Sequence, residues 1–160
     1  MQRTKNDLPE PRRAKLTELC NARLADAIDL QTQCKQAHWN VRGPSFFQLH
    51  ELFDQVNEDA EEYVDLIAER VVQLGGAALG TARVAAQRST LAEYPHGITA
   101  GRDHVEALST ALATFAKAAR QAVETADELD DADTADIFTE ISRGTDKWLW
   151  MVEAHLQAER

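Results

Sequence analysis

The amino-acid sequence predicts an all-α protein whose core is a bundle of four long helices. Glycine and proline, which interrupt helices, number only 7 and 4 among 160 residues. Hydrophobic residues make up 44% of the chain, which is enough for one domain with a sizeable core. No apolar run approaches the roughly 20 residues of a membrane-spanning helix, so we expect no membrane partner.

The first two helices are delimited by prolines and glycines. The first is predicted to begin at the prolines of residues 9–11, where proline is tolerated, and to end near Asn40. Between these points apolar side chains recur at steps of three and four residues, and the Gly-Pro pair at 43–44 follows. Ser45 can cap a second helix, which runs up to the Gly-Gly pair at 75–76.

The remaining residues supply a crossover and two further helices. Residues 77–100 form a long connection that could hold a short helix near 82–88. A third helix is predicted over about 101–127, and the acidic turn ELDDAD separates it from a fourth over about 133–157. Because the long crossover joins the second helix to the third, this order is that of a ferritin-like four-helix bundle.

The cysteines and the N-terminal residues indicate in which cellular compartment the protein is found. Cys20 and Cys34 lie fourteen residues apart in the first helix, about 21 Å, which is too far for a disulfide bond. The segment MQRTKNDLPEP has no apolar core and is not a signal peptide. We therefore expect a cytoplasmic protein with two reduced thiols in its core.

A polar stripe follows the second helix. Advancing about 100° per residue places one histidine and six carboxylates within one arc: His50, Asp54, Glu58, Glu61, Glu62, Asp65 and Glu69. The core-facing side collects Leu52, Phe53, Val56, Ala60, Tyr63, Ile67, Val71 and Leu74. Crowded carboxylates repel one another, so the stripe is either a solvated acidic face or a site for cations. The net charge of −10 is compatible with both.

Two pairs on the stripe have the i,i+4 spacing at which side chains can share a metal ion: His50 with Asp54, and Asp65 with Glu69. The pairs are about 16 Å apart along the helix, so one metal centre cannot reach both within one chain. If two copies of the helix pair antiparallel, facing residues have a constant sum of residue numbers, and one sum brings Asp54 to Asp65 and His50 to Glu69. A two-fold axis would therefore build two identical sites, each from both subunits.

The stretch HWNVRGPSFFQLHELFD, residues 38–54, adds a further nitrogen ligand, because His38 lies just across the Gly-Pro turn from His50. Two imidazoles and three carboxylates form a mixed nitrogen and oxygen set that suits iron, manganese or zinc. Hard carboxylates favour ferric over ferrous iron, so such a site would drive oxidation as it binds. The stretch therefore predicts half of an intersubunit metal site.

The motifs that carry these residues are KQAHWNVRG (35–43), LHELFD (49–54) and DLIAERVVQLGG (65–76). In these motifs the sequence resembles the Dps family, ferritin-like mini-ferritins named as DNA-binding proteins from starved cells. The resemblance covers nearly the whole chain. It implies a single ferritin-like Dps domain over 1–160, in which residues 1–8 are a short N-terminal tail.

The resemblance also implies a ferroxidase site at a two-fold interface, with ligands from both subunits: His38, His50 and Asp54 from one, Asp65 and Glu69 from its partner. The family oxidises two Fe²⁺ ions there, preferably with hydrogen peroxide, and stores ferric mineral in a hollow dodecamer. Zinc could substitute for iron. Trp39, beside His38, would be a sacrificial electron donor or an aromatic that packs the dimer interface.

Other polar residues have alternative roles in this scheme. Acidic side chains that could line iron-entry pores at three-fold axes are Asp127, Asp131, Asp133, Asp136 and Glu140, although Asp131 and Asp133 could instead cap a helix. His96 lies in the crossover, while His104 and His155 are isolated on long helices and are expected at the surface or an interface.

Binding and protection of DNA is the alternative function that the resemblance raises. Relatives that bind DNA typically use a mobile lysine-rich tail, whereas basic residues near this N-terminus are few: Arg3, Lys5, Arg12, Arg13 and Lys15. With a charge of −10 per subunit, attraction to phosphate should be weak. A purely structural bundle is a third alternative, which the regular spacing of the ligands disfavours.

Overall fold

The computed structural model describes residues 1–157, which form five helices and contain no strand. The helices are α1 (Glu10–Asn40), α2 (Phe46–Gln73), α3 (Ala82–Arg88), α4 (Gly101–Glu128) and α5 (Ala132–Gln157). The predicted ferritin-like bundle is confirmed, including the short helix in the crossover. Pro9 precedes α1, and Gly75 and Gly76 follow α2, as predicted.

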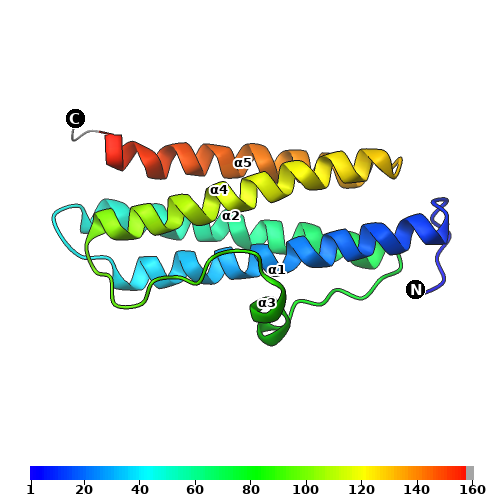
Figure 1. Ribbon diagram of the computed structural model, residues 1–160, viewed down its shortest axis with the longest axis horizontal. Coiled ribbons are helices and arrows are strands. Elements are labelled where there is room, and N and C mark those ends of the chain that lie inside the picture. Colours follow the sequence, from blue (N-terminus) through cyan, green and yellow to red (C-terminus); the bar gives the residue numbers. More distant parts are fainter. Residues whose placement is uncertain (158–160) are drawn as a thin grey trace.

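The long helices form an elongated bundle of two antiparallel pairs (Figure 1). A turn at residues 41–45 joins α1 to α2, and a turn at residues 129–131 joins α4 to α5. The crossover from α2 to α4 runs along the bundle, and α3 packs on the outer side of α1. The α1–α2 turn and the C-terminal end of α5 share one end of the molecule, opposite the N-terminus (Figure 1).

The core contains the apolar face that the sequence predicts for α2. Its buried side chains are Phe53, Val56, Ala60, Tyr63, Ile67 and Val71, while Leu52 is only partly buried. Phe115 of α4 and Phe138 of α5 are fully buried in the same core. Full burial of a large apolar side chain contributes roughly 1.5–3 kcal/mol, so this packing fixes which face of α2 points outward.

The two ends of α2 differ in their capping hydrogen bonds. Gly75 has φ +84°, and the N–H groups of Gly75 and Gly76 donate to the carbonyl oxygens of Val72 and Val71. This is the Schellman arrangement, in which glycine is preferred because L side chains disfavour positive φ. Ser45 stands at the N-cap of α2, but its side chain makes no capping hydrogen bond, so the predicted cap is wrong in that respect.

Two carboxylates of α1, one buried and one half-buried, hold the crossover in place. Asp26 is fully buried and accepts hydrogen bonds from the backbone N–H and the hydroxyl of Thr90, at 2.7 and 3.0 Å. Asp29 accepts a hydrogen bond from the Ser89 hydroxyl. These bonds fix the segment after α3 against α1.

A buried ion pair ties the end of α2 to the start of α5. Arg70 Nη2 donates to both carboxylate oxygens of Asp131 at 2.8 and 2.9 Å, and Arg70 Nε donates to the hydroxyl of Thr134 at 2.9 Å. Asp131 is only 4% exposed. Its prediction as a pore residue is therefore wrong: the carboxylate turns inward to neutralise Arg70. Its position at the start of α5 agrees with the capping alternative, since Thr134 N–H also approaches it at 3.5 Å.

The cysteines are buried and not bonded to each other, as predicted. Burial raises the pKa of the Cys20 and Cys34 thiols to about 12, so both remain protonated. Within residues 1–157, no helix is long and apolar enough to cross a membrane.

Candidate metal centre

The α1–α2 turn brings His38 and His50 together. His38 Nδ1 donates to the carbonyl oxygen of His50 at 2.8 Å, and His50 Nδ1 donates to the carbonyl oxygen of His38 at 2.9 Å. The two rings stack, with centroids 3.7 Å apart and planes 20° apart. Because a carbonyl oxygen only accepts, both Nδ1 atoms carry a proton, and Nε2 is the ring nitrogen that could bind a metal. Metal-binding histidines are usually oriented by such a bond from the second nitrogen.

Asp54 lies one turn after His50 on α2 and faces α1. Its Oδ1 is 3.9 Å from His38 Nδ1 and accepts a hydrogen bond from the ammonium group of Lys35 at 2.5 Å. This bond from Lys35 is the main reason that the pKa of Asp54 lies below its ordinary value; partial burial opposes it, and the nearby His38 and His50 add to it. The carboxylate is therefore ionised at neutral pH and can act as an oxygen ligand.

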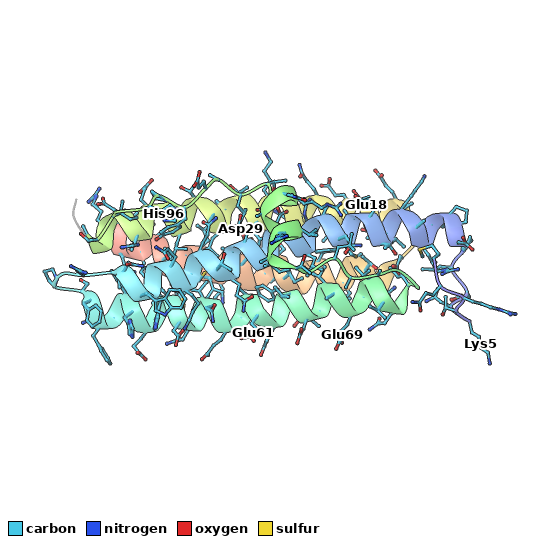
Figure 2. All side chains as sticks on the ribbon, turned by 90° about the horizontal axis from the view of Figure 1, so that it is seen from below. Lys5, Glu18, Asp29, Glu61, Glu69 and His96 are labelled. Carbon is cyan, nitrogen blue, oxygen red and sulfur yellow. The ribbon has the colours of Figure 1, made fainter. Side chains whose placement is uncertain are left out.

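Asp65 and Glu69 lie further along α2 and are exposed. Since α2 is one continuous helix, the separation of about 16 Å from Asp54 holds in the folded chain. Figure 2 shows Glu61 and Glu69 projecting from the same outward side of this helix. Within one chain over residues 1–157, no three His, Cys, Asp or Glu side chains lie close enough to hold a metal ion. A single chain therefore presents two separated halves, and their union across a two-fold axis remains a prediction.

The donor atoms of the first half fit a divalent transition metal. The imidazoles of His38 and His50 offer Nε2, because Nδ1 of each ring is bonded to a carbonyl oxygen, and Asp54 offers a negatively charged oxygen. Together they form an incomplete nitrogen and oxygen set. The exposed carboxylates of Asp65 and Glu69 are the oxygen donors that such a set lacks. The five residues predicted from the sequence are thus compatible in chemistry and in exposure.

Comparison with known proteins decides the family. Residues 17–160 match the family described as the ferritin-like domain. A DNA protection during starvation protein of Agrobacterium fabrum (strain C58) is 44% identical, over 97% of this chain and 96% of its own length. The chain belongs to the Dps family of ferritin-like proteins.

Solved Dps structures share this fold over nearly their whole length. DpsC from Streptomyces coelicolor superposes with a TM-score of 0.94 at 29% identity, covering 99% of this chain and 93% of its own. Dps from Microbacterium arborescens, described in a high iron form, superposes with a TM-score of 0.86 at 31% identity, covering 96% of this chain and 97% of its own.

The other acidic residues predicted for a pore of this Dps chain are exposed. They lie at the end of α4 and the start of α5: Asp127, Asp133, Asp136 and Glu140. This end of the bundle is opposite the α1–α2 turn (Figure 1). Their role in iron entry remains a prediction.

His104 is not at the surface, so that prediction is wrong. It is 1% exposed, and its Nδ1 lies 2.6 Å from the hydroxyl of Tyr94. Desolvation lowers the pKa of His104, and therefore the ring is neutral in the core. His155 is exposed, as predicted, and His96 in the crossover is exposed as well.

Trp39 is 67% exposed at the end of α1. With Lys35, Tyr94 and His96 it lines a groove of about 880 Å³ between α1 and the crossover. An exposed tryptophan in a groove could pack against a second Dps subunit or donate an electron, and both roles remain predictions.

Sequence reasoning missed Lys35. The available signal was its position three residues before His38, which places both side chains on one face of α1. That it contacts Asp54 depends on how α1 and α2 align, which no local pattern states.

Proposed function

We propose that this Dps protein is a ferroxidase and iron-storage protein that protects the cell from oxidative damage. It oxidises Fe²⁺, preferably with hydrogen peroxide, and stores the ferric product in a hollow dodecamer of identical subunits. Membership of the Dps family supports iron storage and oxidative protection. The high iron form of the Microbacterium arborescens relative, 31% identical, supports iron as the substrate.

The observation that carries the proposal is the reciprocal bonding of His38 and His50. It holds two imidazoles with Nε2 available for metal, next to an ionised Asp54. Asp65 and Glu69 of the partner subunit complete the set in the proposed two-fold dimer. Three carboxylates stabilise Fe³⁺ more than Fe²⁺, because hard anionic oxygens favour the more highly charged ion. The same residues that bind the substrate therefore favour its oxidation.

One hydrogen peroxide matches a pair of Fe²⁺ ions in the number of electrons transferred. Two Fe²⁺ ions bound side by side give up one electron each, and one hydrogen peroxide accepts both as its O–O bond breaks. Both oxygens are then reduced together to the level of water, so no hydroxyl radical is released. Zinc has no redox change and would occupy the same ligands without turnover. We place this activity in the reducing cytoplasm, where the buried Cys20 and Cys34 stay as thiols.

The test is anaerobic loading with Fe²⁺, followed by mixing with peroxide or with oxygen. Absorbance of the ferric product gives the rate, and residual peroxide gives the stoichiometry. We expect faster oxidation with peroxide and two Fe²⁺ consumed per peroxide. Oxidation no faster than in protein-free buffer would contradict the proposal.

A further inference from the structure

We propose that Tyr94 and His104 form an acid-sensitive latch, which holds residues 93–99 of the crossover closed while the imidazole is neutral and releases them when it is protonated. The latch is separate from the proposed metal site and needs neither a metal ion nor an oxidant. It depends on the burial of the imidazole, on its bond to the tyrosine hydroxyl and on the hollows that the tyrosine ring lines.

The latch joins the crossover to the first turn of α4. His104 is 1% exposed, and its Nδ1 lies 2.6 Å from the hydroxyl oxygen of Tyr94. Burial raises the pKa of Tyr94, so the hydroxyl keeps its proton and donates it to Nδ1. The neutral imidazole then carries its own proton on Nε2. The carbonyl oxygens of Asn40 and Ile98 lie near the ring, but Nε2 has no hydrogen-bond partner in good geometry within residues 1–157.

Protonation of His104 would break this contact. An imidazolium has an N–H on both nitrogens, so it cannot accept a proton from the Tyr94 hydroxyl. It would also place a positive charge near the N-terminus of α4, where the helix dipole disfavours cations. The titratable groups around the ring do not neutralise that charge: Tyr94 and the neighbouring Cys34 of α1 stay protonated, and Asp103 of α4, which favours the charged form, is exposed to solvent. Within the described chain, α2 and α5 contribute no further charge at the ring.

The two halves of the crossover are held by different groups. Residues 89–92 are bonded to side chains of α1 that include no histidine: Asp26, Asp29 and Gln33. Residues 93–99 are held by the latch and by the bond that the Arg42 N–H donates to the carbonyl oxygen of Thr99 at 2.8 Å. Opening of the latch should therefore release the second half and leave the first in place.

Tyr94 lines two hollows, which leave room for its side chain to move. One is the groove of about 880 Å³ that also contains Trp39. The other is a cavity of about 360 Å³ between the crossover and α4, whose lining includes Pro95, Ile98 and Ala107. A Tyr94 side chain that left His104 would thus displace few packed atoms.

The direction of the pH dependence follows from the pKa of His104. Desolvation lowers this pKa below its ordinary value of 6.5 in the closed state, so the released state, with a more hydrated ring, binds the proton more readily. The closed state is therefore fully favoured above about pH 6.5 and loses stability as the pH falls from there toward the pKa of the closed state.

Hydrogen–deuterium exchange of the assembled protein at about pH 8 and about pH 5, corrected for the intrinsic rate at each pH, measures the opening. The Arg42 amide reports on the second half of the crossover, and the Thr90 amide reports on the first. The variants are His104→Gln, which is neutral at both pH values, and Tyr94→Phe, which lacks the hydroxyl. His96→Gln, an exposed histidine within the same segment, is the matched control. Circular dichroism and size-exclusion chromatography verify folding and assembly.

In wild type and His96→Gln, the Arg42 amide should exchange at least about tenfold faster at about pH 5 than at about pH 8, whereas the Thr90 amide should change little. His104→Gln should remove this pH dependence. Tyr94→Phe should speed exchange of the Arg42 amide already at about pH 8, because the bond that closes the latch is missing.

Equal protection of the Arg42 amide at both pH values in wild type would overturn the inference, as would an equal loss of protection at Arg42 and Thr90. A full pH response in His104→Gln would also overturn it, since His38 and His50 at the α1–α2 turn are unchanged in that variant and would be the source. If the variants failed to assemble, the comparison of the two amides in wild type would still decide.

Discussion

His38 and His50 hold each other in place by hydrogen bonds. At the scale of single residues, the proposed oxidation of Fe²⁺ depends on this arrangement. Each ring donates its Nδ1 proton to the backbone carbonyl of the other residue, so the bond that orients each proposed ligand also closes the α1–α2 turn. Loss of either ring frees a carbonyl oxygen beside the other. If the two rings are metal ligands, as we propose, the fold orients them before any metal arrives.

His50→Ala or Asp54→Ala should lower the rate of Fe²⁺ oxidation by at least about 10–100-fold, because each removes a proposed ligand to the substrate. Assembly should persist, since both side chains lie on the polar side of α2, away from its core face. Stopped-flow absorbance of the ferric product measures the rate. Gln55→Ala, an exposed neighbour on the same helix, is the control. Unaltered rates in both ligand variants would sink the assignment of these residues.

The helix α2 has two roles, core packing and metal binding in the proposed site, and each role belongs to a different face of the helix. Its apolar face packs into the core, while its outward face carries both halves of the proposed site. Its C-terminal end is held to α5 by Arg70 and Asp131. Burial by itself would raise the pKa of Asp131, but the bonds from Arg70 and Thr134 outweigh it and leave the pKa below its ordinary value.

Arg70→Met should lower the free energy of unfolding at pH 7 by about 3–5 kcal/mol, because it leaves the Asp131 carboxylate buried without its partner. In the folded wild type the pKa of Asp131 is lowered, so the pair contributes fully above about pH 4 and less as pH falls through the folded pKa. The difference between variant and wild type should therefore shrink between pH 7 and pH 3. Denaturant unfolding at equal subunit concentration measures both effects.

Arg120→Met is the matched control for this prediction. Arg120 pairs with Asp146 at 2.9 Å, but the two side chains are 50% and 52% exposed. Loss of such an exposed pair should cost no more than about 1 kcal/mol. Equal losses in the two variants, or a difference that grows in acid, would contradict the role given to Arg70.

The helices were predictable because their limits are local. The Gly-Gly pair at 75–76 and the Gly-Pro pair at 43–44 interrupt otherwise unbroken helical patterns. The histidine and carboxylate spacing on α2 is also local, which is why the candidate ligands could be named. Contacts between segments were not predictable: Asp131 turns inward toward Arg70, His104 is buried against Tyr94, and Lys35 reaches Asp54. Each of these depends on the alignment of two elements, which periodicity does not report.

The charge distribution of the whole molecule bears on DNA binding. The chain carries a net charge of −10, and part of its small N-terminal basic cluster is committed to the fold. Arg12 pairs with Asp130 at 2.7 Å. Arg13 is buried and donates to the carbonyl oxygens of Leu8 and Leu74 at 2.9 Å each. Neither is presented to a phosphate backbone as freely as the sequence alone suggests.

DNA binding should consequently be undetectable at physiological salt, or should vanish steeply as salt rises, because few cations remain to displace the counterions of DNA. A gel-shift titration of the assembled protein at about 0.15 M salt, repeated at about 0.01 M, measures this. Arg3→Ala with Lys5→Ala identifies any contribution of the N-terminal residues. Tight, stoichiometric retardation at the higher salt would show that the basic residues act as a DNA-binding surface after all.

The central claim is that each metal site is shared by two subunits, and mixed assemblies test it most directly. One subunit carries His50→Ala with Asp54→Ala, and the other carries Asp65→Ala with Glu69→Ala. Each should be inactive alone, since every site lacks one half. In a mixed dimer one site regains both halves and the other has neither, so random pairing of equal amounts should restore about a quarter of wild-type ferroxidase sites. Native mass spectrometry verifies mixing, and stopped-flow oxidation counts active sites. Recovery near that fraction is the predicted result; no recovered activity in verified mixed assemblies would contradict a site built across the two-fold axis.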